Sequence, residues 1–232
     1  MRLLRLATPV LLLLFPVFGS YASNSKGDDV DAILTNVQKA TRGITTVHAG
    51  IYQEKRFGGI GGSEKYNGDL LFKHTSPSMD RLRVRYYTGS EVTNDLSVIG
   101  DDVVFYQPRI KQAIVTKRSK QANKKPEYGF IASPYVSVPQ LKAQYNITYL
   151  RDESLASGKA AVLDLTPKDL GGSQVKKVVI WVDRNVWLPM QYQVTEKNAD
   201  VTTYSINNMT TPKIADKEFK IDLPKGTKII NQ

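Results

Sequence analysis

The sequence predicts a mainly β protein with a small helical part, built on one wide, curled antiparallel sheet. From Ile44 onward the apolar residues follow a period of two, in runs rich in Val, Ile, Tyr and Thr. Short turns rich in Gly, Asn and Asp separate these runs, as in a meander whose neighbouring strands pair antiparallel. About a dozen such runs predict a sheet wide enough to curl around its own apolar face.

The N-terminus has the pattern of a cleavable secretory signal peptide over residues 1–22. Arg2 and Arg5 precede an apolar stretch, and the small residues Ser20 and Ala22 follow it where a signal peptidase requires them. The apolar stretch over 6–18 is interrupted by two prolines and is shorter than the ~20 residues of a membrane-spanning helix. We therefore expect cleavage after Ala22 rather than a membrane anchor.

The remaining chain, 23–232, is expected to form a single domain in the periplasm. The sequence contains no Cys, so it lacks the lipid-modified cysteine that tethers exported lipoproteins and needs no disulfide for stability. Its 32 Lys and Arg residues against 22 Asp and Glu residues give a formal net charge of +10. Such a surplus favours nucleic acid, an anionic membrane or an acidic partner, and export argues against nucleic acid. Transient membrane contact therefore fits the composition.

The first predicted element after the signal peptide is an amphipathic helix over 28–40. Asp28 or Asp29 is suited to cap its start, and Gly43 is suited to end it. Its apolar residues recur at steps of three and four, at Val30, Ile33, Leu34, Val37 and Ala40.

The strands follow at short intervals, each bounded by turn residues. We expect them over 46–56, 69–74, 80–87, 91–99, 103–106, 110–116, 147–151, 160–166, 175–182, 188–195, 200–207 and 219–223.

Side chains on several strands alternate between an apolar and a polar face. Leu82, Val84 and Tyr86 oppose Arg81, Arg83 and Arg85, and Leu188, Met190, Tyr192 and Val194 share one face. One face of the sheet is therefore expected to be apolar and the other solvated. The run 178–182 is apolar at every position, which predicts a strand covered on both faces.

A long irregular stretch, 117–144, separates the two groups of strands. It contains three prolines and scattered apolar residues, and a segment of this length inside a compact domain is typically a lid or a disordered loop. Its apolar content favours a lid that lies on the sheet. Short helical turns are expected near 120–123 and 138–144.

The sequence has no pattern of catalytic or metal-binding residues. It contains two histidines, His48 and His74, and no Cys, so no zinc cluster or cysteine nucleophile is predicted. The glycine group over 58–62 is followed by a strand and lacks the Lys-Ser/Thr pair of a phosphate loop, which favours a hairpin tip. We expect neither an enzyme nor a cofactor.

A basic cluster extends from Arg109 to Lys125. One interpretation is a solvated loop. The other is a docking surface for acidic partners or anionic headgroups, because opposite charge accelerates encounter without a large contact. In the second interpretation the docking residues are Lys117, Arg118, Lys120, Lys124 and Lys125.

The order of several short motifs resembles the periplasmic lipoprotein carrier family, the LolA-like proteins. The motifs are Gly-Asp-Leu-Leu-Phe-Lys over 68–73 with Pro77, the hairpin 99–108 followed by Lys111 and Gln112, Leu-Asp-Leu-Thr-Pro-Lys over 163–168, Leu-Pro-Met-Gln over 188–191, and the stretch 219–226 ending Leu-Pro-Lys-Gly. Together they cover nearly the whole mature chain.

This resemblance implies an incomplete, unclosed antiparallel β-barrel of about 11–12 strands, covered by helices and a lid segment. It also implies an acylated lipoprotein or lipid cargo, an inner-membrane release complex and an outer-membrane acceptor. The family's lid-tethering arginine corresponds to Lys73 or His74 here, and Phe105 replaces the hairpin tryptophan. With the longer segment after Lys117, these departures fit a divergent relative whose cargo need not be a lipoprotein.

Two functional hypotheses follow. The first is a carrier of acyl chains, because the transfer of each buried methylene from water is favourable by about 0.8 kcal/mol and a soluble carrier must therefore supply an apolar cavity. The second is a periplasmic regulator that senses lipids or lipoproteins and binds a membrane-bound signalling partner. For the carrier, the expected lining residues are Leu82, Val84, Tyr86, Phe105, Leu163, Leu165, Ile180, Met190 and Tyr192, and plain core packing is the alternative for each.

Overall fold

A computed structural model describes residues 30–59, 61–76, 79–121, 138–169, 171 and 174–232. The predicted signal peptide, the central part of the predicted lid and the docking residues Lys124 and Lys125 lie outside the described residues.

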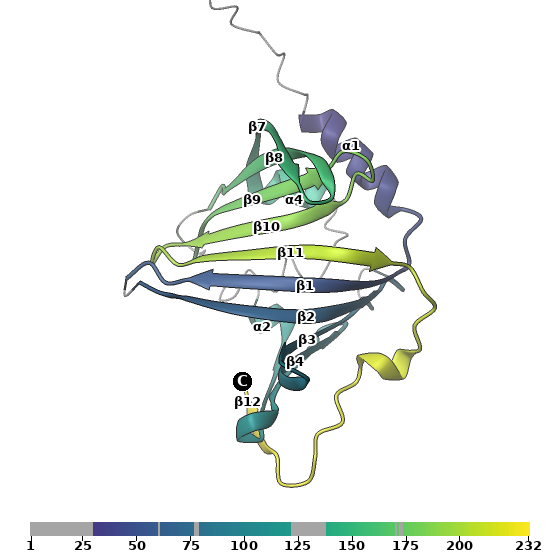
Figure 1. Ribbon diagram of the computed structural model, residues 1–232, viewed down its shortest axis with the longest axis vertical. Coiled ribbons are helices and arrows are strands. Elements are labelled where there is room, and N and C mark those ends of the chain that lie inside the picture. The colour runs from purple at the N-terminus through teal and green to yellow at the C-terminus, as the bar shows by residue number, and fades with distance from the viewer. Residues whose placement is uncertain (1–29, 60, 77–78, 122–137, 170, 172–173) are drawn as a thin grey trace, which may run out of the picture.

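The described residues form a few helices and a long series of strands (Figure 1). The helices are α1 (Val30–Thr41), α2 (Arg118–Gln121) and α4 (Val138–Gln144), with the 3-10 turns η1 (Pro108–Ile110) and η2 (Asp216–Phe219). The strands are β1 (Thr46–Arg56), β2 (Ser63–Lys73), β3 (Arg81–Thr88), β4 (Glu91–Ile99), β5 (Asp102–Gln107), β6 (Gln112–Lys117), β7 (Tyr145–Leu155), β8 (Gly158–Pro167), β9 (Val175–Asp183), β10 (Pro189–Glu196), β11 (Val201–Thr210) and β12 (Lys228–Asn231).

All twelve strands belong to one sheet, in the order β12-β6-β5-β4-β3-β2-β1-β11-β10-β9-β8-β7. The sheet curls strongly but does not close, so β12 and β7 form its two edges (Figure 1). The predicted unclosed barrel is therefore confirmed. The pairing departs from the expectation at one edge, because β12 runs parallel to β6 while the other ten strand pairs are antiparallel.

The inner face of the sheet carries the main apolar core. Alternate residues of β1, β2, β3, β4, β8 and β9 contribute to one buried cluster that also includes Ile33 and Leu34 of α1 and Leu141 of α4. The helices α1 and α4 are linked by an ion pair between Asp31 and Lys142, 2.5 Å apart. The period-two pattern thus assigns the inward positions correctly, because each strand has one face on this core.

Strand β9 is buried on both faces, as predicted from its continuous apolar run. Val178, Ile180 and Val182 point to the main core, whereas Val179 and Trp181 join Ala160 and Val162 in a second cluster on the outer face. The neighbouring strands β10 and β11 are polar on that outer face, where Gln191 and Ser205 hydrogen-bond across the ladder.

The outer face of β3 is not solvated in the expected way. The arginine side chains of β3 are paired with carboxylates: Arg83 contacts both oxygens of Asp95, at 3.0 and 2.7 Å, and Arg85 contacts Asp69 at 2.8 Å. Residues 211–227, here called the C-terminal strap, also cross this face. The polar side of β3 was predicted correctly, but the strap covers part of it, because alternation identifies the polar side of a strand and not what lies over it.

The last predicted strand, 219–223, was also wrong. Phe219 ends η2 with its side chain fully buried, and its carbonyl accepts a hydrogen bond from Ser97 Oγ at 2.5 Å. This contact holds the chain against the sheet face rather than in a ladder. The twelfth strand forms only at Lys228–Asn231, where Ile229 and Ile230 suit an edge strand.

Candidate functional site

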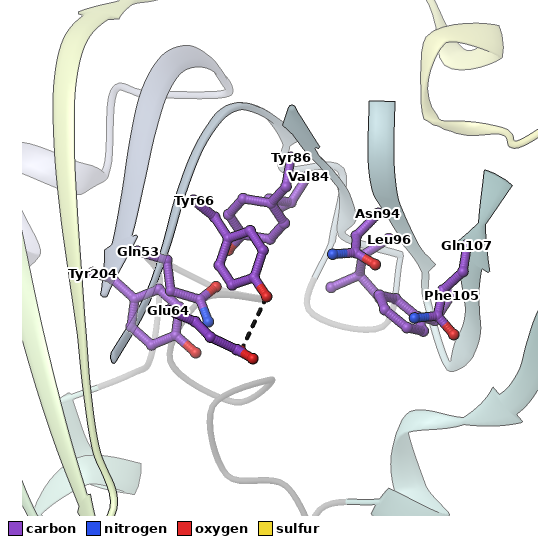
Figure 2. A pocket seen from close by; sticks show the side chains of 10 residues that line it. All are labelled: Gln53, Glu64, Tyr66, Val84, Tyr86, Asn94, Leu96, Phe105, Gln107 and Tyr204. Atoms are coloured by element: carbon purple, nitrogen blue, oxygen red, sulfur yellow. Dashed lines mark hydrogen bonds between the residues drawn. The ribbon is translucent and has the colours of Figure 1, made fainter. Parts of the chain in front are cut away.

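A cavity of about 260 Å³ opens on the inner face of the sheet, toward one end of β1, β2, β3, β4, β5 and β11 (Figure 2). Its lining residues are Gln53, Glu64, Tyr66, Val84, Tyr86, Asn94, Leu96, Phe105, Gln107 and Tyr204. The cavity combines apolar and polar side chains.

The apolar floor comes from three neighbouring strands. Val84 of β3 is registered against Leu96 of β4, which in turn is registered against Phe105 of β5. Directly opposite residues on antiparallel strands lie close enough for their side chains to pack. The local register therefore forms one apolar strip across the sheet.

Tyr86 reaches the cavity because its partner across the ladder is a glycine. Gly68 is registered against Tyr86, and a Cβ at Gly68 would come within 2.3 Å of the Arg85 carbonyl oxygen and 3.1 Å of the Tyr86 ring. The missing side chain lets the Tyr86 ring lie back over β2 toward Tyr66, where the ring centroids are 5.8 Å apart. Gly68 thus shapes this wall of the cavity by having no side chain.

The remaining lining side chains are polar. Tyr66 Oη donates a hydrogen bond to Glu64, 3.0 Å away, and burial together with this carboxylate raises the pKa of the Tyr66 phenol (Figure 2). Gln53, Asn94 and Gln107 form no side-chain hydrogen bond with another described residue. Each amide presents both donor and acceptor atoms to a ligand. Glu64 is the single carboxylate of the lining.

Three of the expected lining residues, Val84, Tyr86 and Phe105, line this cavity. Five others are buried in the main core instead: Leu82, Leu163, Leu165, Ile180 and Tyr192. Met190 is half-buried beside a β-bulge between Pro189 and Gln191, because the register against β9 shifts there. Lipid binding by these nine residues stays a prediction.

Sequence reasoning missed the polar half of the lining. Gln53, Asn94 and Gln107 each lie two residues from an inward-facing apolar residue, namely Ile51, Leu96 and Phe105. The alternation that identified the apolar positions therefore also pointed to these amides. An inward position is recognised in a sequence by an apolar side chain, so these polar side chains gave no signal of their own.

The two predicted lid contacts lie at the end of β2. Lys73 Nζ is 2.8 Å from Asp216 and 3.2 Å from the Ile214 carbonyl, both on the C-terminal strap. His74 Nδ1 lies 2.7 Å from Asp80. Contact of either residue with the lid stays a prediction, since 122–137 lies outside the described residues.

The basic docking segment is partly neutralised by its neighbours. The β5–β6 ladder places Asp102 opposite Lys117, with Nζ 2.5 Å from the carboxylate, and this ion pair raises the pKa of Lys117. Asp101 accepts hydrogen bonds from the backbone and hydroxyl of Ser119. The cluster lacks acidic residues along the chain, but the fold brings two beside it, Asp101 from the turn before β5 and Asp102 from the start of β5.

The fold and the cavity together define a class of protein in which an unclosed sheet curls around an amphipathic cavity. Residues 42–222 match the model of the family described as outer membrane lipoprotein carrier protein LolA. The chain therefore belongs to the LolA family. Among curated proteins, none matches the chain in sequence.

Several solved structures resemble the chain at low sequence identity. An uncharacterized conserved protein from Thermus thermophilus has a TM-score of 0.56 and 14% identity, with 87% of this chain and 98% of that chain covered. MucB has a TM-score of 0.51 and 14% identity, covering 83% and 62%. A putative outer membrane lipoprotein-sorting protein domain from Vibrio parahaemolyticus has a TM-score of 0.47 and 14% identity, covering 81% and 94%. At such identities, the first two support the fold alone.

No helix among the described residues is long and apolar enough to cross a membrane.

Proposed function

We propose that this chain is a non-enzymatic periplasmic carrier that binds the acyl chains of lipoproteins or lipids and moves them from the inner to the outer membrane. Its partners would be an inner-membrane release complex and an outer-membrane acceptor. The observation that carries the proposal is the cavity on the inner face, whose apolar floor adjoins the main core. Membership of the LolA family supports the same conclusion.

The size of the cavity constrains how cargo enters. Its volume of about 260 Å³ lies just below the ~300–1,000 Å³ of typical ligand pockets. A long acyl chain therefore enters fully only if packed inner-face side chains separate. We therefore propose two roles for four buried residues, Leu82, Leu163, Leu165 and Ile180. They form part of the core in the empty protein, and they line an opened cavity when cargo is bound.

The polar rim supports an amphiphilic cargo rather than a bare hydrocarbon. An acyl chain gains from contact with Val84, Leu96 and Phe105, whereas Gln53 and Gln107 require hydrogen-bonding partners or water. The proposed orientation places the chain over the apolar floor and the headgroup beside the amides.

A matched pair of substitutions on β5 tests acyl-chain binding. Phe105 lines the cavity and Val104 points to the opposite face, and both side chains are half-buried. Phe105→Asp is expected to lower the affinity for a fluorescent fatty-acyl probe at least tenfold, because a carboxylate must be desolvated in the apolar floor. Val104→Asp is expected to leave probe affinity within about twofold, provided circular dichroism shows that both variants fold. Equal affinities would contradict the proposal.

The regulator remains the second candidate, since MucB, a protein with this fold, has been solved in complex with MucA. Capture from native membranes separates the two functions. A carrier would be recovered with acylated cargo whose transfer to outer membranes it accelerates. A regulator would be recovered with a membrane-bound partner, and lipid would change its affinity for that partner without net transfer.

A further inference from the structure

The edge of the sheet formed by η1 and β12 exposes two large apolar side chains. Ile110 is 62% exposed and Ile229 is 53% exposed. They are far apart in the chain but adjacent in the fold, because β12 pairs with β6 in parallel and the Lys228 amide donates to the Lys111 carbonyl at 2.8 Å. Only the closing of β12 onto β6 therefore brings these isoleucines to one edge.

The same edge carries free positive charge. Arg109, Lys111 and Lys228 are exposed, and none of them forms an ion pair with a described residue. At the other end of β6, roughly 17 Å away for a six-residue strand, Lys117 is already paired with Asp102. The η1 end thus carries three cations that no described carboxylate neutralises.

The turn holds its side chains outward. Pro108 begins η1, and Lys111 ends it with a left-handed backbone at φ 49° and its amide donating to the Pro108 carbonyl. Gln107, the residue before η1, lines the cavity. The exposed edge is therefore continuous with the cavity wall and lies at the cavity end of β5 and β6.

We propose that this docking edge, consisting of Arg109, Ile110, Lys111, Lys228 and Ile229, binds the surface of an anionic lipid bilayer and brings the cavity mouth against it. Exposed isoleucines insert into the interfacial region while adjacent cations contact lipid phosphates, which is the chemistry of peripheral membrane binding. The long stems of Lys and Arg allow their charges to stay in the headgroup layer. The biological role of this docking edge rests on the proposed carrier function. The docking edge locates where cargo leaves the protein for a membrane.

Vesicle binding by the exported full chain tests the charges. Arg109→Gln with Lys228→Gln is expected to weaken binding to phosphatidylglycerol-containing vesicles about tenfold, while Arg118→Gln with Lys120→Gln, an equal change in charge at the opposite end of β6, changes it less than about twofold. Vesicles of phosphatidylcholine alone should bind all three proteins weakly. Equal losses in the two double variants would overturn the proposal, because binding would then follow net charge.

Site-specific labels test insertion without altering the core. The chain contains no Cys, so Ile110→Cys, Ile229→Cys or Val186→Cys each creates a unique labelling position. Val186 is 49% exposed and lies outside the docking edge. An environment-sensitive fluorophore is expected to shift to the blue at 110 and 229 on adding anionic vesicles, and not at 186. No shift at 110 and 229 would overturn the proposal, as would protection of these positions by an acidic protein partner but not by vesicles.

Acyl-probe affinity separates this proposal from the carrier function. The Arg109→Gln/Lys228→Gln variant should bind the fluorescent fatty-acyl probe as the unmodified protein does, because neither side chain lines the cavity. Loss of vesicle binding with intact probe binding supports the docking edge. Intact vesicle binding in this variant, whatever the probe result, contradicts it.

Discussion

We expect Glu64 to make the rim of the cavity selective for the charge of a headgroup. Its carboxylate is the single one among the lining residues, and Tyr66 holds it by a hydrogen bond. Glu64→Gln is expected to raise the affinity for a dodecyl sulfate-type amphiphile about threefold, since one repulsive charge at the solvated rim contributes under ~1 kcal/mol. Titration with sulfate and maltoside amphiphiles of equal chain length measures the effect.

The control is Glu54→Gln, which removes an equal charge from the opposite face of β1, where Glu54 lies near Lys65. It should alter neither affinity. A gain for both amphiphiles in the Glu64 variant would indicate a steric effect instead of charge selectivity.

Tyr87 links stability to alkaline pH. Burial, together with a hydrogen bond to Asp69, raises the pKa of Tyr87 to about 12 from 10.0. Because the folded state binds this proton more tightly than the unfolded state does, protonated Tyr87 contributes to the free energy of unfolding. This contribution is complete below pH 10 and is lost as the pH rises toward 12. Tyr87→Phe is expected to flatten the fall in the free energy of unfolding over that window, measured by urea denaturation at each pH. An unchanged slope would show that other tyrosines account for it.

At the scale of elements, the C-terminal strap connects strands that are distant in the sequence. Thr46 of β1, Lys73 of β2, Arg83 of β3 and Ser97 of β4 all donate hydrogen bonds to its backbone carbonyls. The strap therefore spans the outer face of four neighbouring strands before it continues to β12. The position of β12 depends on these contacts.

Phe219 is expected to anchor this strap. Its side chain is fully buried, so Phe219→Ala should lower the free energy of unfolding by about 3–5 kcal/mol through lost burial and the resulting cavity. Leu223→Ala, at a half-buried position of the same strap, should cost less than half as much. Urea denaturation measures both, and similar small losses would mean that the strap does not stabilise the sheet.

At the scale of the whole molecule, we expect the helices to move away from the sheet when cargo enters. Helices α1 and α4 cover the inner face, and their Asp31–Lys142 ion pair marks a point where they can be joined. In the Asp31→Cys/Lys142→Cys variant, a short bis-maleimide cross-link is expected to reduce the affinity for a 16-carbon probe at least tenfold while leaving an 8-carbon probe nearly unaffected. The uncross-linked variant is the control, and equal losses for both probes would argue against opening of the core.

The sequence alone determined the fold class and many local boundaries. The predicted bounds of β1 and β4 agree with the structure, and the continuous apolar run of β9 identified a strand buried on both faces. The helix near 138–144 was also predicted. These features depend on the local period of apolar residues, which directly reports how a segment meets the core.

Tertiary structure decided the features that depend on contacts between distant segments. The approach of Asp102 to Lys117, the parallel pairing of β12 with β6 and the covering of Arg83 by the strap follow from the curl of the sheet and the path of the chain across it. The amides of the cavity became a site only when the neighbouring strands and their register placed them around an apolar floor. A period of two specifies which face a side chain occupies, but it carries no information about which distant residue faces it there.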